Sequence, residues 1–403
     1  MIELKGKYNE AKIFTDNADA GTIGQVMSLL NQESMKNSKI RIMPDCHMGK
    51  GCTIGSTITI HDKVIPNLVG VDISCGMHIA KLKEKRIDLP KLDSVIRKEI
   101  PAGFSIREKE HKYAKNINLE ELRCVKHVDL DRAYKSIGTL GNGNHFCELD
   151  KDDDENIYLV VHTGSRNLGK QVAEYYQKEA WTLLKDGNRG ELIKAKIAEL
   201  TAAGRKTEIE AAIKEIKSTV DVVPYELAYC ECKLFDDYIH DMKIVQEFAY
   251  WNRAAIVDTI TKEMKLNVVE EFQTIHNYID TEHMILRKGA VSARKGEKLI
   301  IPINMRDGAL ICIGKGNDDW NQSAPHGAGR LMSRGEAKKN FTVSEFKKTM
   351  QEAGIYTTSV GADTLDECPM TYKPMQEIID NIQDTVEIEK IIKPIYNFKA
   401  GGE

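Results

Sequence analysis

The sequence lacks the features that would direct it into or across a membrane. Its 403 residues contain no run of about 18 apolar side chains that could span a bilayer. The N-terminal segment, MIELKGKYNEAKIF, has neither the basic part nor the apolar part of a secretory signal. Pro/Ser-rich linkers and low-complexity stretches are also missing. We therefore expect a cytoplasmic protein that contacts no membrane, folded as one large domain or as two closely joined lobes.

Disulfide frameworks and the common phosphate-binding loops are absent as well. The nine cysteines are an odd number without regular spacing, which suits a reducing compartment. No G-x-G-x-x-G follows a predicted strand, and G-x-x-x-x-G-K-[ST] does not occur, so any nucleotide must be held by another kind of site. A net charge of −4 and an aromatic content of 6% do not favour a non-catalytic RNA-binding protein, which would be basic or rich in aromatic platforms.

The apolar pattern divides the chain into strand-like flanks and a helical middle. Short apolar runs separated by Gly, Asn and Asp dominate residues 1–165 and return over 266–315, whereas helical spacing prevails from about Lys170 to Met264. Because strands and helices are segregated, we predict an α+β fold with a β-rich core and a helical middle segment. Within that segment, residues 190–222 are predicted to form a charged helical hairpin. It is either a solvated arm that packs through one stripe or an arm that binds a partner.

Several loops set metal-competent side chains among glycines or small polar residues, as happens where loops converge on one site. Asp72 and Cys75 lie three apart in GVDISCGM, and three histidines occupy GNGNHF, VHTGSR and TIHNY. These are His145, His162 and His276. A lone histidine is more often a core or surface residue, but three beside a carboxylate and a thiol favour a metal cluster. The mixed ligand set suits a first-row divalent ion, and the ligands alone permit Zn²⁺, Fe²⁺ or Co²⁺.

Nine segments, in order along the chain, resemble the RtcB family of RNA-splicing ligases. They are MPDCHMGKG, GVDISCGM, GTLGNGNHF, HTGSR, EFAYWNR, HNY, RKGAVSAR, HGAGRLMSR and the lysine of NFKAGGE. The resemblance covers essentially the whole chain and implies one RtcB-like domain over residues 1–403. It also implies a GTP- and manganese-dependent ligase that joins RNA 3′-phosphate or 2′,3′-cyclic phosphate ends to 5′-hydroxyl ends, in tRNA splicing or RNA repair. It does not identify an activating protein partner.

Carried over residue by residue, the resemblance implies that Cys75 bridges two Mn²⁺ ions, with His162 and His276 on one and Asp72 and His145 on the other. His326 is similar to the family histidine that takes GMP from GTP, and Asp45 to the aspartate that orients it. The remaining roles implied are guanine recognition for Glu148, Lys399 and Tyr372, a phosphate contact for Asn144, and the path of the RNA 3′-phosphate for Arg166, Lys288 and Arg334.

The chemistry of these residue types agrees with those roles. A neutral imidazole in an HGAG loop can attack phosphorus with little steric obstruction, and two metal ions would offset the charge on the phosphate. Five cations in the motif loops are expected to balance the remaining negative charge of the phosphates: Arg166, Arg287, Lys288, Arg330 and Arg334. The alternative is a dimetal phosphoesterase or cyclic phosphodiesterase without guanylylation. It would need neither His326 nor a guanine pocket, so the presence of both favours the ligase.

Two segments depart from the family pattern. Ser74 replaces the middle glycine of GVDIGCGM, a change that we expect to tighten the turn. Ile303 and Asn304 stand in the Gly-Ser places of a PGSM-like segment that contacts the nucleotide in the family. The resemblance therefore does not define how that part of the chain would hold a nucleotide.

Overall fold

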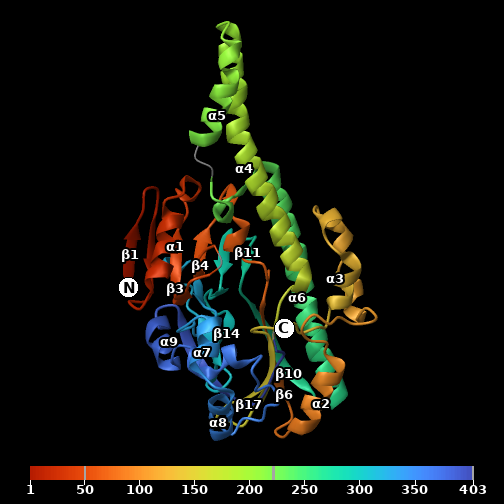
Figure 1. The fold of residues 1–403 in the computed structure, drawn as a ribbon. Coiled ribbons are helices and arrows are strands. Elements are labelled where there is room, and N and C mark those ends of the chain that lie inside the picture. The colour runs from red at the N-terminus through yellow and green to blue at the C-terminus, as the bar shows by residue number, and fades with distance from the viewer. Residues whose placement is uncertain (50, 220–222, 402–403) are drawn as a thin grey trace.

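Two large β-sheets carry the fold, which a computed structural model describes for residues 1–49, 51–219 and 223–401 (Figure 1). The seven-stranded sheet is antiparallel throughout and runs in the order β10 (Val268–Ile275), β6 (Gly76–Leu82), β8 (Ile157–Thr163), β7 (Phe146–Lys151), β17 (Val386–Lys399), β15 (Gly308–Gly314) and β14 (Lys298–Asn304). The six-stranded sheet runs β1 (Ile2–Lys5), β2 (Glu10–Ile13), β3 (Ile40–His47), β4 (Ile54–Thr59), β12 (Ile285–Lys288) and β11 (Tyr278–Asp280). Two small pairs complete the strands, β13 (Ala290–Ser292) with β16 (Ser323–Pro325) and β5 (Lys63–Val64) with β9 (Cys230–Glu231).

The helices flank these sheets and include two of unusual length. They are α1 (Ala20–Leu30), α2 (Leu89–Glu99), α3 (Leu130–Ser136), α4 (Arg166–Ala202), α5 (Ile209–Thr219), α6 (Cys232–Met264), α7 (Arg334–Asn340), α8 (Val343–Glu352) and α9 (Met375–Ile382). The predicted α+β class is confirmed. None of the helices in the described ranges combines the length and apolar character of a membrane span.

Both faces of the seven-stranded sheet are buried, one by helix α6 and the other by the curl of the sheet itself. On one face, Leu159 and Val161 of β8 pack with Ile256 and Ile260 of α6. On the other face, the strands β6 and β8 meet β14, β15 and β17 of the same sheet through the cluster Met77, Ile79, Tyr158, Val160, Ile300, Ala309, Ile311 and Ile392. Each fully buried aliphatic side chain contributes about 1.5–3 kcal/mol. The curl therefore holds the strand ends in fixed relative positions.

Helices α4 and α5 form an arm that projects from the sheets (Figure 1). Helix α4 is 37 residues long, and beyond its end Gly204 adopts φ +73°, which glycine tolerates better than other residues. Leu200 is buried near the tip, whereas Leu192 is exposed. Residues 220–222, the last three of the predicted hairpin, lie outside the described residues.

Two buried polar residues of α6 fix the loops beside the seven-stranded sheet. The Asn252 side chain accepts hydrogen bonds from the backbone N–H of Gly138 and of Thr139 at 2.8 and 3.0 Å, and donates to the carbonyl of Gly164 at 2.9 Å. The next residue, Arg253, donates to the carbonyl of Ser74 at 2.7 Å. Buried backbone groups need such partners, so α6 determines where three separate loops lie.

We expect Asn252→Ala to lower the free energy of unfolding by about 3 kcal/mol, because it leaves buried backbone donors and an acceptor unpaired. Urea unfolding measures the change. Glu247→Ala, on the exposed side of the same helix, serves as the control and should shift stability by less than about 0.5 kcal/mol. Equal losses in the two variants would contradict a role for Asn252 beyond helix propensity.

Candidate metal centre and nucleotide pocket

The predicted metal ligands lie at one end of four neighbouring strands of the seven-stranded sheet. Strands β10 and β8 terminate at this end, while β6 and β7 begin there, because adjacent strands are antiparallel. The register pairs Gly76 with both Ile275 and Thr163, and Phe146 with His162. The ligand side chains therefore gather at one point although they are far apart in the sequence.

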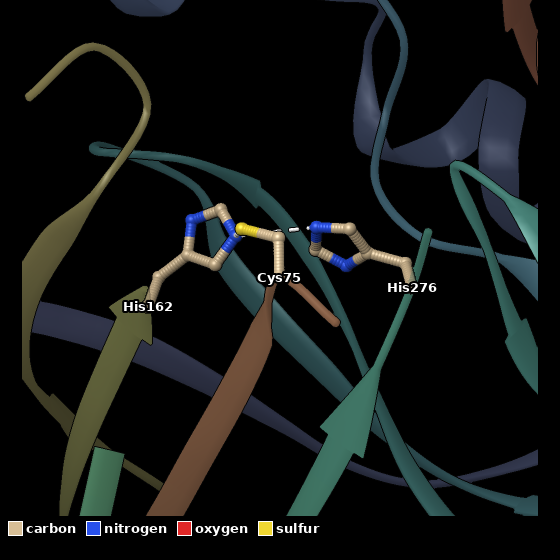
Figure 2. A group of neighbouring side chains, drawn as sticks. All are labelled: Cys75, His162 and His276. Atoms are coloured by element: carbon tan, nitrogen blue, oxygen red, sulfur yellow. Dashed lines mark hydrogen bonds between the residues drawn. The ribbon is translucent and has the colours of Figure 1, made fainter. Parts of the chain in front are cut away.

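Their donor atoms form two groups of three that share the Cys75 sulfur. In the first, Cys75 Sγ lies 3.2 Å from His162 Nε2, which lies 3.3 Å from His276 Nε2. Figure 2 shows these three side chains pointing toward one another. In the second, His145 Nε2 lies 3.3 Å from Cys75 Sγ and 2.8 Å from Asp72 Oδ2. This is the division into two sets that the family resemblance implied.

The donor set fits a divalent cation. His162 Nδ1 donates to the carbonyl of Asn144 at 2.9 Å, so its Nε2 carries a lone pair. That single lone pair faces both the Cys75 thiol and the His276 ring and cannot satisfy both. Two nitrogens bound to one ion at about 2.0–2.1 Å in tetrahedral geometry lie about 3.3 Å apart, which is the separation observed between His162 and His276.

Burial favours the neutral form of His162 and of His276, which is the form that binds a metal. Burial lowers the pKa of His162 to about 3, with the charge of His145 adding to the effect. Burial and the neighbouring charge of His326 place the pKa of His276 well below its ordinary value. Burial and the charge of Asp72 raise the pKa of the Cys75 thiol, so a thiolate there needs a nearby cation.

The turn between Asp72 and Cys75 is held in a strained conformation. Ser74 adopts φ +57°, in the left-handed region, where a residue with a Cβ costs about 1 kcal/mol. Its N–H donates to the carbonyl of Asn277, and the His276 N–H donates to the carbonyl of Cys75, both at 2.8 Å. These bonds lock the turn to the loop that carries His276. A serine at this position thus occupies a conformation that a glycine would adopt without strain.

His326 approaches the metal ligands from outside the seven-stranded sheet. It follows β16, and its Nδ1 lies 2.7 Å from Oδ2 of Asp45 in β3. The same oxygen accepts the backbone N–H of His326 and of Gly327, each at 3.2 Å. This arrangement leaves Nε2 of His326 as the available ring nitrogen, and the ring centroid lies 4.8 Å from that of His276. Gly329 is required nearby, because a Cβ there would come within 2.5 Å of the Asp45 carbonyl oxygen.

Two of the predicted nucleotide residues, Tyr372 and Lys399, meet at a carboxylate that the sequence reasoning missed. Glu367 is buried and accepts hydrogen bonds from Lys399 Nζ and from the Tyr372 hydroxyl, both at 2.7 Å. Arg334 Nη1 lies 2.7 Å and Arg330 Nη1 lies 3.3 Å from its other oxygen. Burial opposes ionisation of Glu367, but the charges of Lys399 and Arg334 outweigh it and lower its pKa to about 2. The only sequence signal was its place in DECPMTYK, five residues before Tyr372.

Glu148 and Lys399 lie on the neighbouring strands β7 and β17. Asn397 pairs in register with Glu148 and donates from its side chain to the Glu148 carboxylate. Burial raises the pKa of Glu148. The Asn144 side chain is exposed, and the contribution of this residue to the metal centre is its backbone carbonyl.

The five cations of the motif loops do not share one environment. Arg287 is fully buried, donating to Ser323 Oγ and the Tyr278 hydroxyl at 2.8 Å, so its expected place at the phosphates is wrong. Lys288 is also buried and contacts Cys52 Sγ at 2.7 Å. Arg166 donates to Thr139 Oγ1 and the Gly103 carbonyl, while Arg334 and Arg330 pair with Glu367. The position of a cation in a motif loop does not reveal whether its side chain is buried or faces a site.

The segment 300–308, which departs from the family pattern, covers the end of β14 and the turn to β15. Ile303 is in the apolar core, and the Asn304 side chain accepts the backbone N–H of Arg306 and of Asp307. The segment approaches the His326 loop through the carbonyl of Pro302, which a Cβ on Gly327 would meet at 3.4 Å. Ile303 is thus a core residue, and the Asn304 side chain holds the turn.

The chain is similar to known proteins over most of its length. The family described as "tRNA-splicing ligase RtcB" matches residues 25–400, a span that contains every site residue named above. The chain is 31% identical to "RNA-splicing ligase RtcB1" of Escherichia coli and 30% identical to "RNA-splicing ligase RtcB" of E. coli K12, with 90% of both chains covered in each case. It is 25% identical to "tRNA-splicing ligase RtcB" of Methanococcus maripaludis, over 87% of this chain and 85% of that one.

We expect Cys75→Ala to remove more bound metal than His276→Ala, because only Cys75 belongs to both donor groups. Metal affinity should fall by more than the roughly 10- to 100-fold that loss of an outer-shell partner costs. Elemental analysis after dialysis measures the retained ions, with His283→Ala, an exposed histidine outside the two groups, as the control. Unchanged metal content in Cys75→Ala would refute a shared sulfur ligand.

We expect Glu367→Gln to lower stability by about 3 kcal/mol at neutral pH, since a pKa drop from 4.5 to about 2 corresponds to that free energy. The folded state has the lower pKa, so the contribution is complete above about pH 5 and is lost as the pH falls toward 2. Urea unfolding of wild type and variant across this range measures it. Glu352→Gln, which changes an exposed partner of Lys348, should show no such dependence. A stability difference between wild type and Glu367→Gln that stays the same at every pH would contradict the assignment.

Proposed function

The chain belongs to the RtcB family of RNA-splicing ligases, and from this membership we propose that it joins RNA ends through a covalent guanylate on His326. It is an RNA ligase that acts in splicing or repair. The observation that carries the covalent step is the placement of the His326 ring between a buried aspartate and the metal ligands. A dimetal phosphoesterase that cleaves with a metal-bound water would not need a nucleophile held in this way.

The Asp45 contact prepares His326 for attack. With Nδ1–H donated to the carboxylate, Nε2 keeps its lone pair, and the carboxylate stabilises the positive charge that the ring acquires when Nε2 forms a bond. The HGAG loop adds little bulk around the ring, so a phosphate can approach along the nitrogen lone pair. This geometry supports nucleophilic catalysis by His326 with Asp45 as the orienting group.

We propose three successive transfers. Nε2 of His326 bonds to the α-phosphorus of GTP while the bond to pyrophosphate breaks. An oxygen of the RNA 3′-phosphate then attacks the same phosphorus and releases the histidine, and finally the 5′-hydroxyl attacks the activated 3′-phosphate and releases GMP. A 2′,3′-cyclic phosphate end would first be hydrolysed to the 3′-phosphate. Each step exchanges one phosphorus bond for another, so no oxidant or reductant is needed.

Two Mn²⁺ ions would be held by the two donor groups, where divalent ions polarise phosphate oxygens and reduce their charge.

The residues around the pocket have separable tasks. Burial disfavours the charged form of Glu148 and raises its pKa, and the N1–H and N2–H of guanine would stabilise that charge. Tyr372 and Lys399 would complete the base pocket, Asn144 would contact a phosphate, and Arg166, Lys288 and Arg334 would line the path of the RNA 3′-phosphate.

We expect incubation with Mn²⁺ and GTP labelled at the α-phosphate to give a covalently labelled protein. His326→Ala should abolish the label, and Asp45→Asn should slow labelling by about 100-fold or more, because it removes the charge that holds the ring. His283→Ala serves as the control. An unlabelled wild-type protein that still binds metal and hydrolyses a cyclic phosphate would support the phosphodiesterase instead.

A further inference from the structure

Phe104 presents an aromatic ring to solvent at the mouth of a cleft. It is 66% exposed, and no other large apolar side chain among the described residues is more exposed. The ring lines a cleft of about 550 Å³. Burial of a phenylalanine normally stabilises a protein, so a ring left outside the core suggests a ligand for its face.

The loop around Phe104 is fixed by the structure. The N–H of Gly103 donates to the Gly141 carbonyl at 2.9 Å, and Arg132 donates to the carbonyl of Phe104 at 2.9 Å. The turn is closed by the N–H of Ser105, which donates to the Ala102 carbonyl at 3.2 Å. The backbone that carries the ring is therefore fixed, and little backbone order would have to be gained when the ring binds a flat ligand.

The same loop contacts the proposed path of the RNA 3′-phosphate. Arg166 Nη2 donates to the carbonyl of Gly103 at 2.8 Å, and its Nη1 has no hydrogen-bond partner in the part of the chain that is described. A Cβ on Gly141 would collide with both the Arg166 guanidinium and the His145 ring. Gly103 and Asn142 line the cleft, and Gly141, next to Asn142, lies against both Arg166 and the metal-ligand candidate His145.

The walls of the cleft suit a nucleotide better than an apolar peptide. The lining includes Arg97, Asn142 and Ser359, and Asp363 supplies its one carboxylate. Lys399 also lines the cleft, but its Nζ is paired with Glu367 of the base pocket. Polar walls of this kind can pair with the edges of a base, while cations favour its anionic backbone. Aromatic rings next to cationic grooves are the usual platforms for single-stranded nucleic acids.

We propose that this cleft binds the terminal nucleotide of the RNA strand that carries the 3′-phosphate, with Phe104 stacked on its base and Arg166 at its phosphate. The proposal rests on the ligase function given above. It makes Phe104 a positioning residue: it touches the substrate but takes no part in bond making. Because any base has a flat face, the stack would tolerate every terminal base.

The first test measures binding without ligation. An RNA ending in 2-aminopurine 3′-phosphate is titrated with the protein, and stacking is followed as quenching of the base fluorescence. We expect strong quenching with wild type and with Phe104→Tyr, and affinity reduced about 10-fold or more in Phe104→Ala, within the range that one base stack contributes. Tyr250→Ala, which removes another exposed ring, is the control and should bind as wild type does. Equal affinity and quenching in wild type and Phe104→Ala would overturn the proposal.

The second test locates the stacked base by ligation. Replacing the 3′-terminal base with an abasic sugar should raise the KM for RNA in wild type and have no further effect in Phe104→Ala. An abasic sugar at the 5′-hydroxyl end should slow both proteins equally. If only the 5′-end substitution removes the effect of Phe104→Ala, the assignment to the 3′ strand is wrong; if Phe104→Ala ligates every RNA normally, the ring serves a protein partner instead.

Guanylylation by GTP separates this inference from the ligase function on which it rests. Phe104→Ala should be labelled at the wild-type rate, because the ring contacts neither His326 nor the metal ligands. Absence of label in both proteins would count against the ligase function, while the fluorescence titration would still decide whether Phe104 stacks on RNA. A labelling defect confined to Phe104→Ala would overturn a role restricted to RNA.

Discussion

The structure depends on one constraint: four adjacent antiparallel strands of a curled sheet have their ligand-bearing ends side by side. Hydrogen bonding between the strands fixes their register, and this register places two imidazoles on one side of a thiol and a carboxylate with a third imidazole on the other. Unpaired lone pairs at such short separations are unfavourable in a buried site unless a cation joins them. The folded β-sheet therefore fixes in advance the arrangement that a metal centre requires.

The site is completed by elements outside that sheet. Asn252 and Arg253 of α6 hold the ligand loops, Asp45 of the six-stranded sheet holds His326, and Glu367 gathers the cations and the tyrosine of the nucleotide pocket. Each uses a buried polar group to fix a loop at a definite position. The proposed guanylyl transfer would need this rigidity, because the nucleophile and the ions would have to meet the same phosphate.

Much of the fold and the site could be predicted from the sequence. The segregation of strand-like and helical patterns predicted the α+β class, and the short polar motifs predicted which side chains form the metal-competent cluster. Side-chain environment could not be predicted in the same way. Arg287 and Arg166 belong to similar motif loops, yet one is buried against Tyr278 while the other lies beside Gly103 and Gly141. Charge and spacing alone contain no information about which neighbours surround a cation.

The sequence by itself determined which residue types are available to bind a metal, attack phosphorus or recognise a base. It also indicated that these residues lie in loops at the ends of apolar segments. Only the tertiary structure decided the division of the ligands into two groups sharing Cys75, the central position of Glu367, and the exposure of Phe104 beside Arg166. The physical reason is that these features arise from contacts between segments far apart in the chain. Such contacts depend on register, curl and burial, which local sequence patterns do not specify.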